Sequence, residues 1–243
     1  MEKSGTSLRH ILAAHGGLEY WRSLQSLEVE MSASGLLFTT KRIPPTRHLR
    51  LTVSTERPEV TLHDYPAPGQ VALFQGEGFV QVQDAKSKVL QARTHPRAMF
   101  GRLRRQLYWD TLDFAFFCGY AMWNYLTMPF LFLQDGVEVE VSSDPAFEGL
   151  TRVTAHFPKG FSTHCATQHF YFDGDGHLQR HDYTAEVVGG WASAAHLCSE
   201  YRQFGGLSLP TQRRVYPKLL LNKPLSMITL VAIDIHDVKP VMR

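Results

Sequence analysis

The chain has little cysteine and no long apolar run. Its three cysteines, Cys118, Cys165 and Cys198, are odd in number and lie far apart among 243 residues. This pattern disfavours a disulfide framework and favours a reducing compartment. No segment of about 18 consecutive apolar residues exists, which excludes a simple membrane-spanning helix.

The chain also has no marked excess of one charge. Its 25 Lys+Arg and 23 Asp+Glu residues give a net charge of +2, which argues against general nucleic-acid binding through counterion release. The first residues include Glu2, Lys3 and Arg9 and no apolar segment. No secretory signal is therefore predicted, and a cytoplasmic location is expected.

Aromatic residues (Phe 15, Tyr 9, Trp 4) and 12 histidines are abundant. Apolar and polar side chains alternate in residues 27–34, which predicts a half-buried strand. Similar short segments recur between turn residues, such as the Asp-Gly pairs at 173–176. Strands are predicted at 27–34, 36–41, 48–55, 60–65, 71–75, 79–83, 137–142, 150–157, 168–172, 178–188, 194–204, 211–216 and 227–238.

Two segments have helical spacing instead. Residues 7–24 predict an N-terminal helix, although Gly16-Gly17 interrupts its apolar stripe, and residues 97–133 predict a helical insertion whose second half is buried. With no internal repeat or linker, we expect one α+β domain over residues 1–243. It is a strongly curved antiparallel sheet of about ten strands, a half-barrel with its helices enclosing a hydrophobic cavity.

Two sequence strings carry a family resemblance: AHGGLEYWRSLQSLEVEMSASG at residues 14–35, and FYFDGDGHLQRHDYTAEVVGGWASAAHLCSEYRQFGGLSLPTQRRVYP at residues 170–217. Their order of turns and strands resembles the LolA/LolB lipoprotein-carrier superfamily. The resemblance implies an unclosed half-barrel wrapped around helices, with a hydrophobic cavity. That fold is also similar to the fold of a cofactor-free violacein-biosynthesis enzyme, which implies that the scaffold can host chemistry.

The most polar block within a predicted strand is residues 180–183. Because side chains alternate, His181 and Tyr183 share the more apolar face, where they would serve as base and proton donor. The alternative is a core histidine that is hydrogen-bonded to a neighbouring strand. His169, one strand earlier, is a further catalytic candidate.

The helical insertion supplies the remaining candidates. Asp110 and Asp113 lie three residues apart on one helix face, and a buried carboxyl among aromatic rings would have a raised pKa suited to acid–base catalysis. The alternative is that these acids are exposed or pair with arginines. Aromatic and polar side chains of this insertion are predicted to line a substrate pocket: Tyr108, Trp109, Phe117, Tyr120, Trp123, Asn124 and Tyr125.

Several motifs are missing. His156, His164, His169, His181 and His196 lie in the second half, and no two of these five have HxH, HxxxH or HExxH spacing, so no metal site is predicted. There is no P-loop, dinucleotide fingerprint or nucleophile elbow, and no cofactor is predicted.

Two functions remain open. The first is a cofactor-independent isomerase, cyclase or lyase in a biosynthetic pathway, acting on a hydrophobic small molecule by acid–base catalysis. The second is a non-catalytic carrier of a lipid or another hydrophobic ligand. Neither implies a nucleic-acid partner, and the oligomeric state is left open.

Overall fold

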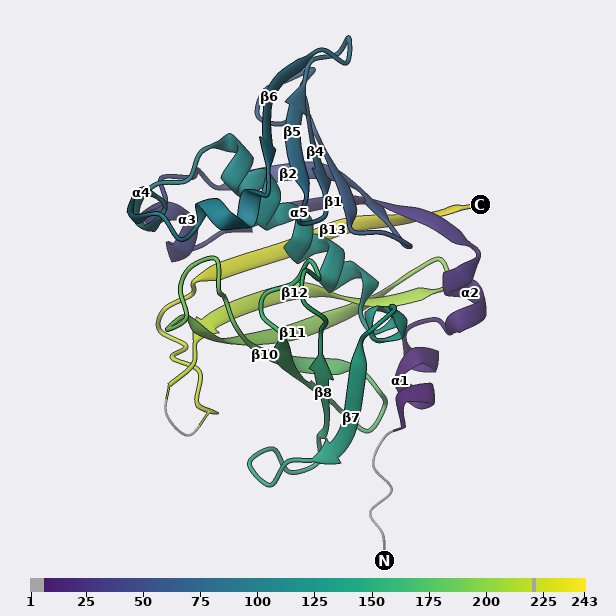
Figure 1. The fold of residues 1–243 in the computed structure, drawn as a ribbon. Coiled ribbons are helices and arrows are strands. Elements are labelled where there is room, and N and C mark those ends of the chain that lie inside the picture. Colours follow the sequence, from purple (N-terminus) through teal and green to yellow (C-terminus); the bar gives the residue numbers. More distant parts are fainter. Residues whose placement is uncertain (1–6, 220–221) are drawn as a thin grey trace, which may run out of the picture.

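A computed structural model describes residues 7–219 and 222–243. Within these ranges, thirteen antiparallel strands form one sheet in the order β6-β5-β4-β3-β2-β1-β13-β12-β11-β10-β9-β8-β7. The strands are β1 (Leu24–Ser34), β2 (Thr46–Ser54), β3 (Glu59–His63), β4 (Val71–Gln75), β5 (Phe79–Gln83), β6 (Val89–Thr94), β7 (Glu138–Ser143), β8 (Thr151–His156), β9 (Thr167–Phe172), β10 (Leu178–Thr184), β11 (Ser193–Phe204), β12 (Leu207–Pro217) and β13 (Val231–Met242). The first strand pairs with the last, which joins an N-terminal half, β1–β6, to a C-terminal half, β7–β13 (Figure 1).

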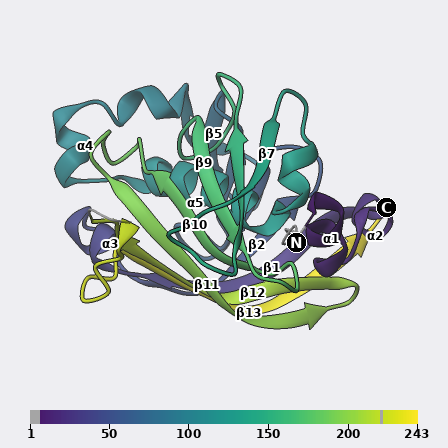
Figure 2. The ribbon, with the colours of Figure 1, turned by 90° about the horizontal axis from the view of Figure 1, so that it is seen from below.

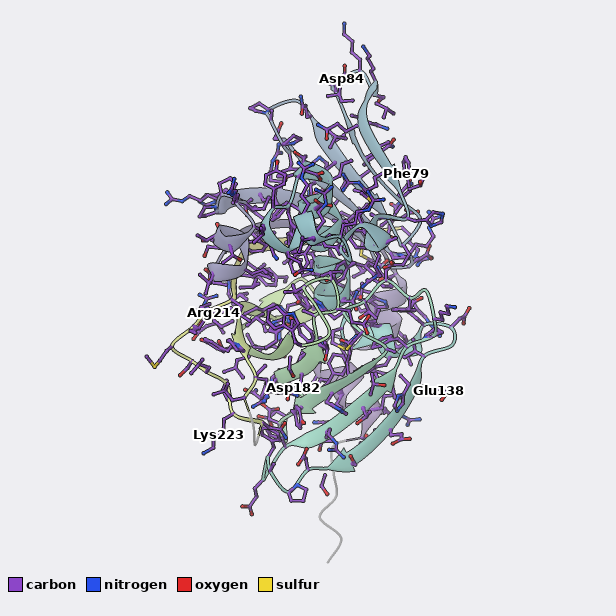
Figure 3. The ribbon with its side chains drawn as sticks, turned by 60° about the vertical axis from the view of Figure 1, so that its left-hand side comes forward. Phe79, Asp84, Glu138, Asp182, Arg214 and Lys223 are labelled. Carbon is purple, nitrogen blue, oxygen red and sulfur yellow. The ribbon has the colours of Figure 1, made fainter. Side chains whose placement is uncertain are left out.

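The sheet curves into an open trough rather than a closed barrel, as seen from below in Figure 2. Its edge strands are β6 and β7. Phe79 on β5 and Glu138 on β7 mark the two sides of the sheet, which remain apart (Figure 3). The chain passes from one edge to the other through the long helix α5 (Thr111–Thr127), which crosses the concave side of the trough.

Shorter helices occupy the two ends of the trough. α1 (Leu8–Ala14) and α2 (Leu18–Arg22) lie at one end, and α3 (Leu36–Thr40) and α4 (Leu103–Leu107) lie at the other (Figures 1 and 2). Two 3-10 turns, η1 (Pro96–Met99) and η2 (Phe130–Leu133), flank the α4–α5 segment. In residues 7–219 and 222–243, no helix combines the length and apolar character needed to cross a membrane.

Helix α5 is buried on all sides. Every residue from Leu112 to Thr127 is shielded from solvent, as expected for a helix that is apolar around its whole circumference. A helix pairs its own backbone N–H and C=O groups. An irregular segment that passed through the apolar interior would leave these groups unpaired. Gly119 lets the helix approach β4 closely, because a Cβ there would lie 2.4 Å from Phe74.

The start of α5 is fixed by charge. Asp110 is the N-cap residue, and its side chain and that of Asp113 form a reciprocal capping box. Arg93 of β6 and Arg105 of α4 both pair with the two carboxylates, at 2.6–2.8 Å. The helix is therefore tied to the β6 edge at the point where the crossing begins.

The predicted fold class is confirmed, with thirteen strands rather than about ten. The strand predicted at residues 36–41 is wrong, since Leu36–Thr40 forms α3. The chain turns sharply at Gly35 (φ 131°), where a Cβ would lie 2.4 Å from the Leu230 carbonyl oxygen. The amides of Leu36 and Leu37 then donate to the carbonyls of Thr229 and Leu230 before the helix closes.

Other elements also differ from the prediction, for example the strand predicted at residues 178–188, which ends at Thr184. The N-terminal helix is split into α1 and α2 at Gly16 and Gly17, which both have positive φ. Strand β6 was not predicted, because its side chains are mostly exposed and carry no apolar alternation. The last strand begins at Val231 rather than at residue 227, and part of residues 218–230 bridges back through Lys218 and Pro224.

Candidate functional site

A pocket of about 400 Å³ opens between the α3–α4 end of the trough and the C-terminal half of the sheet. It exists because α5 packs mainly on β2–β5 and leaves part of the concave surface of β10–β13 uncovered at this end. Its volume lies within the range of roughly 300–1,000 Å³ that is typical of small-molecule sites. The wall is mostly apolar and is formed by Leu36, Leu37, Thr40, Lys41, Gln106, Phe117, His164, Tyr183, Ala185, Val188, Trp191, Ala192, Ser193, Ala194, Val215, Pro217, Lys218, Leu230 and Val231.

Two stacked rings form a polar part of this wall. The His164 imidazole and the Tyr183 ring are nearly parallel, with centroids 3.9 Å apart. Tyr125 of α5 joins them, because its hydroxyl lies 2.8 Å from His164 Nε2 and 3.1 Å from the Tyr183 hydroxyl. On the other side of the imidazole, the Tyr120 hydroxyl lies 3.3 Å from Nδ1. Both ring nitrogens therefore have hydroxyl partners from α5.

Burial keeps this polar group uncharged. It lowers the pKa of His164 well below its ordinary value, and the positive charge of Arg97 lowers it further. Burial also raises the pKa of Tyr183 and of Tyr125. A neutral imidazole in contact with neutral phenols is an arrangement through which a proton can be passed to or from a bound molecule.

Two further histidines lie behind the stacked pair. His181 Nε2 is 2.7 Å from Gln168 Oε1, and the ring stacks on Phe170 at 4.1 Å. His196 is fully buried beside Tyr125, and neither of its ring nitrogens has a hydrogen-bond partner among the described residues. Burial lowers the pKa of both histidines.

Arg213 is a buried cation that lies next to Tyr125 and these histidines. Its guanidinium donates to the Tyr125 carbonyl at 2.9 Å and to Cys198 Sγ at 3.2 Å. Within the described chain, no carboxylate lies within ion-pair distance of it. Its charge adds to the effect of burial in lowering the pKa of His196.

The structure brings together four of the residues predicted from sequence. Tyr183 and Phe117 line the pocket, and Tyr120 and Tyr125 contact its histidine. His181 shares the inner face with Tyr183, as the alternation predicted, but it is not part of the pocket wall. Its predicted catalytic role stays a prediction.

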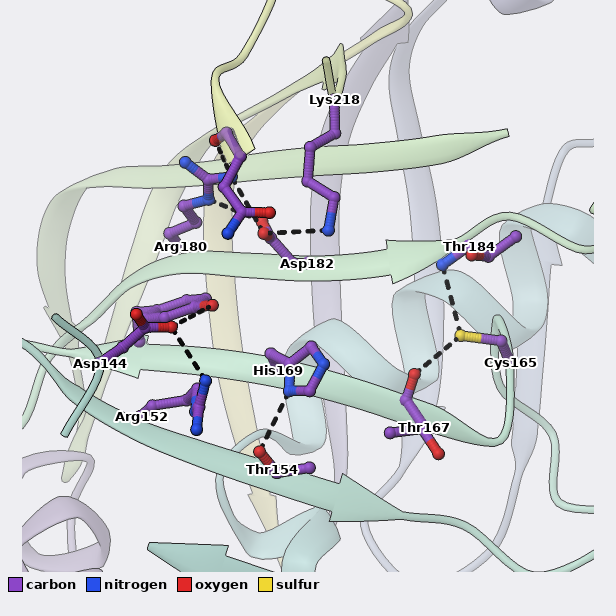
Figure 4. A network of polar contacts seen from close by, with 12 residues as sticks. Asp144, Arg152, Thr154, Cys165, Thr167, His169, Arg180, Asp182, Thr184 and Lys218 are labelled. Atoms are coloured by element: carbon purple, nitrogen blue, oxygen red, sulfur yellow. Dashed lines mark hydrogen bonds and ion pairs between the residues drawn. The ribbon is translucent and has the colours of Figure 1, made fainter. Parts of the chain in front are cut away.

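His169 points to the opposite face of the sheet. Its Nδ1 lies 3.0 Å from Thr154 Oγ1, on the side that also carries Asp182 (Figure 4). This outer network includes Arg180, which forms a 2.6 Å ion pair with Asp182. The sheet itself separates His169 from the pocket.

The two acids and the remaining aromatic residues of the insertion lie away from the pocket wall. Burial raises the pKa of Asp113 to about 6, whereas hydrogen bonds from Arg93 hold the pKa of Asp110 low against the opposite effect of burial. This is the arginine-paired alternative that the sequence left open. The other candidates also lie outside the wall. Tyr108 is half-buried under Arg104, and Asn124 donates to the Tyr120 and Ser162 carbonyls. Trp109 and Trp123 are fully buried, and their indole N–H groups have no hydrogen-bond partner among the described residues.

Sequence reasoning did not single out three titratable residues of the pocket. His164 lies between strands, where no alternation assigns it to a face, and it was noted only as one of five histidines. Lys41 ends α3, which was predicted as a strand. Lys218 follows the last residue of β12. No local sequence pattern marks these residues, because only the tertiary fold brings them into the wall of one pocket.

One group in the described ranges has the donor types and spacing of a metal site: Asp173, Asp175 and His177. It lies in the β9–β10 turn. There the Asp173 carboxylate accepts hydrogen bonds from the backbone amides of Asp175 and His177, so it stabilises the conformation of the turn.

No family model and no curated protein matches this chain. Two solved structures are similar to it. One is a DUF1329 family protein from Desulfovibrio piger, with a TM-score of 0.50, 14% identity and coverage of 95% of this chain and 90% of that one. The other is a LolA superfamily protein from Nitrosomonas europaea, with a TM-score of 0.52, 11% identity and coverage of 96% and 92%. The likeness concerns the fold, and it confirms the LolA-like architecture.

Proposed function

We propose that this chain binds a hydrophobic small molecule in the pocket between α3, α4 and strands β10–β13. The observation that carries the proposal is a preformed, mostly apolar cavity of about 400 Å³ in a LolA-like fold. Ligand sites of this kind have apolar walls with a few polar groups that fix orientation. Here those groups are Lys41, His164 and Tyr183.

Binding is tested with a neutral fluorescent probe, N-phenyl-1-naphthylamine, titrated into the full chain. We expect saturable fluorescence enhancement with one site per chain. Ala185→Trp places a large ring in the pocket wall and should abolish the enhancement. Ala146→Trp, on the exposed β7–β8 turn, is the matched control and should leave it unchanged. Equal enhancement in both variants would show that the probe binds elsewhere.

A second function is favoured by one specific observation. The stacked His164–Tyr183 pair lies in the pocket wall and is hydrogen-bonded to Tyr125. We propose that, if the ligand is transformed, this group moves the proton in a cofactor-independent isomerase, cyclase or lyase reaction. Tyr183 would donate the proton and neutral His164 would accept it.

Comparison of bound molecules tests this second function. Tyr183→Phe removes the phenolic O–H and keeps the ring that stacks on His164. Native mass spectrometry of the two proteins, purified from the same host, would show a different co-purified mass if Tyr183 takes part in a reaction. The same mass in both proteins would favour binding without chemistry.

A further inference from the structure

The pocket wall includes a buried lysine that has no counter-ion among the described residues. Lys41 is 5% exposed and is one of the pocket-lining residues. Its Nζ donates to the Gln106 carbonyl oxygen and lies 5.9 Å from the centroid of the Trp109 ring. Within the described ranges, no carboxylate lies within 4 Å of this ammonium group.

The wall of the pocket supplies no negative charge at all. None of the nineteen residues that line it is Asp or Glu. A buried, unpaired ammonium is energetically costly, and proteins compensate such a charge with an anion or lose the proton. Burial lowers the pKa of Lys41 accordingly.

The second lysine of the pocket provides an internal comparison. Lys218 Nζ lies 3.3 Å from Asp182 Oδ2, so its charge is already compensated from the outer face of the sheet (Figure 4). Asp182 also pairs with Arg180 at 2.6 Å. Of the two pocket cations, Lys41 is therefore the one that an incoming anion would neutralise.

The surroundings of Lys41 separate a polar end of the pocket from an apolar one. Thr40 and Gln106 lie in the same part of the wall, on α3 and α4. The facing strands contribute Ala194, Val215 and Val231. A molecule with a charged head at α3 and an apolar body against the strands would match both.

Building on the proposed function, we infer that the ligand is a single-chain amphiphile with an anionic head group, a carboxylate in its simplest form. Lys41 binds the head with Thr40 and Gln106 beside it, and the apolar wall of β11–β13 binds the chain. The volume of about 400 Å³ is at the lower end of small-molecule sites, which favours one short chain over two.

A series of head groups tests this inference on the unmodified protein. Decanoate, methyl decanoate and decyltrimethylammonium share a chain of similar length and differ in charge. Their affinities are measured by calorimetry, and by displacement of the neutral probe, below the concentrations at which they form micelles. Decanoate should bind about 10- to 100-fold more tightly than the neutral ester, as expected for a charge-assisted contact in a buried site. The cationic amphiphile should bind most weakly.

Two lysine variants then test which lysine causes the preference for decanoate over the ester. Lys41→Met keeps an unbranched side chain and should reduce the preference for decanoate over the ester to less than about threefold, with affinity for the ester unchanged. Lys218→Met is the matched control, because its charge is already paired, and it should keep the preference.

The outcomes separate the two proposals. If none of the three amphiphiles binds, the proposed pocket function fails. If the neutral ester binds as tightly as decanoate, binding stands and the anionic class is wrong. If Lys218→Met rather than Lys41→Met removes the preference, the assignment to Lys41 is overturned. A purely structural Lys41 would show equal losses for the ester and the acid.

Discussion

Acid should destabilise this protein, because four histidines are buried in their neutral form: His15 at the end of α1, whose pKa burial lowers to about 4, and His164, His181 and His196 on the concave face of the sheet. The pKa values of His164, His181 and His196 are all well below 6.5, chiefly because of burial. In the unfolded chain each returns to about 6.5. Below that pH the unfolded state binds protons that the folded state does not. The free energy of unfolding therefore falls as the pH falls below about 6.5, and the stability is fully present above it.

The magnitude follows from proton linkage. Each histidine that stays neutral in the folded protein down to pH 5 lowers the free energy of unfolding by about 2 kcal/mol as the pH falls from about 7.5 to about 5. Four such residues lose about 8 kcal/mol, against a total stability of about 5–15 kcal/mol for a typical domain. Asp113 opposes this loss, since its pKa of about 6 lets the folded state take up a proton first. Its contribution over the same interval is about 1 kcal/mol.

The variant His196→Leu removes one of these histidines and so measures its contribution to the acid destabilisation. Neither ring nitrogen of His196 has a hydrogen-bond partner among the described residues, so the substitution should cost little at pH 7.5. Urea denaturation of both proteins at the two pH values gives four free energies. The loss between pH 7.5 and 5 should be about 2 kcal/mol smaller in the variant than in the unsubstituted chain.

The control is His10→Gln, on the exposed surface of α1, which should reproduce the acid loss of the unsubstituted chain. The reasoning is refuted if His196→Leu loses as much stability at pH 5 as the unsubstituted protein does. That result would mean that His196 is protonated in the fold, or that it leaves the core before the chain unfolds.

Two further predictions concern α5. Gly119→Ala should destabilise the fold by about 1–3 kcal/mol in urea denaturation, because its Cβ would overlap Phe74, whereas Gly101→Ala, with open space at that point, should have little effect. Asp113→Ala should cost about 3–5 kcal/mol, because it leaves Arg105 short of a buried partner and removes half of the capping box. An unchanged urea midpoint in either of these two α5 variants would contradict the packing described for the start and middle of the helix.

The sheet was the predictable part of the structure. Strands such as β4 and β5 match their predicted bounds, because alternation of buried and exposed side chains is a local property. Residues 36–41 show where this fails. An apolar run of this length fits a short strand or a helix equally, and contacts with Thr229 and Leu230, nearly two hundred residues away, decide the outcome.

The pocket was predictable only in part. Tyr183 and the tyrosines of α5 were found because a strand face and a helix face can be assigned from spacing. His164 and Lys41 could not be found in this way, since one lies between strands and the other ends a helix that was predicted as a strand. The treatment of residues 1–243 as one domain stays a prediction, although all thirteen strands described belong to one sheet.

The position of α5 accounts for both the size and the charge of the pocket. By packing on β2–β5, the helix fills the N-terminal side of the trough and leaves a pocket at one end of the C-terminal side. On that side the buried charges Lys41 and Arg213 are positive, and the nearby carboxylate, Asp182, faces the other side of the sheet. Burial keeps His164 and His196 neutral, and the positive charges of Arg97 and Arg213 add to this effect. An anionic ligand is therefore the charge state that the interior accommodates most favourably.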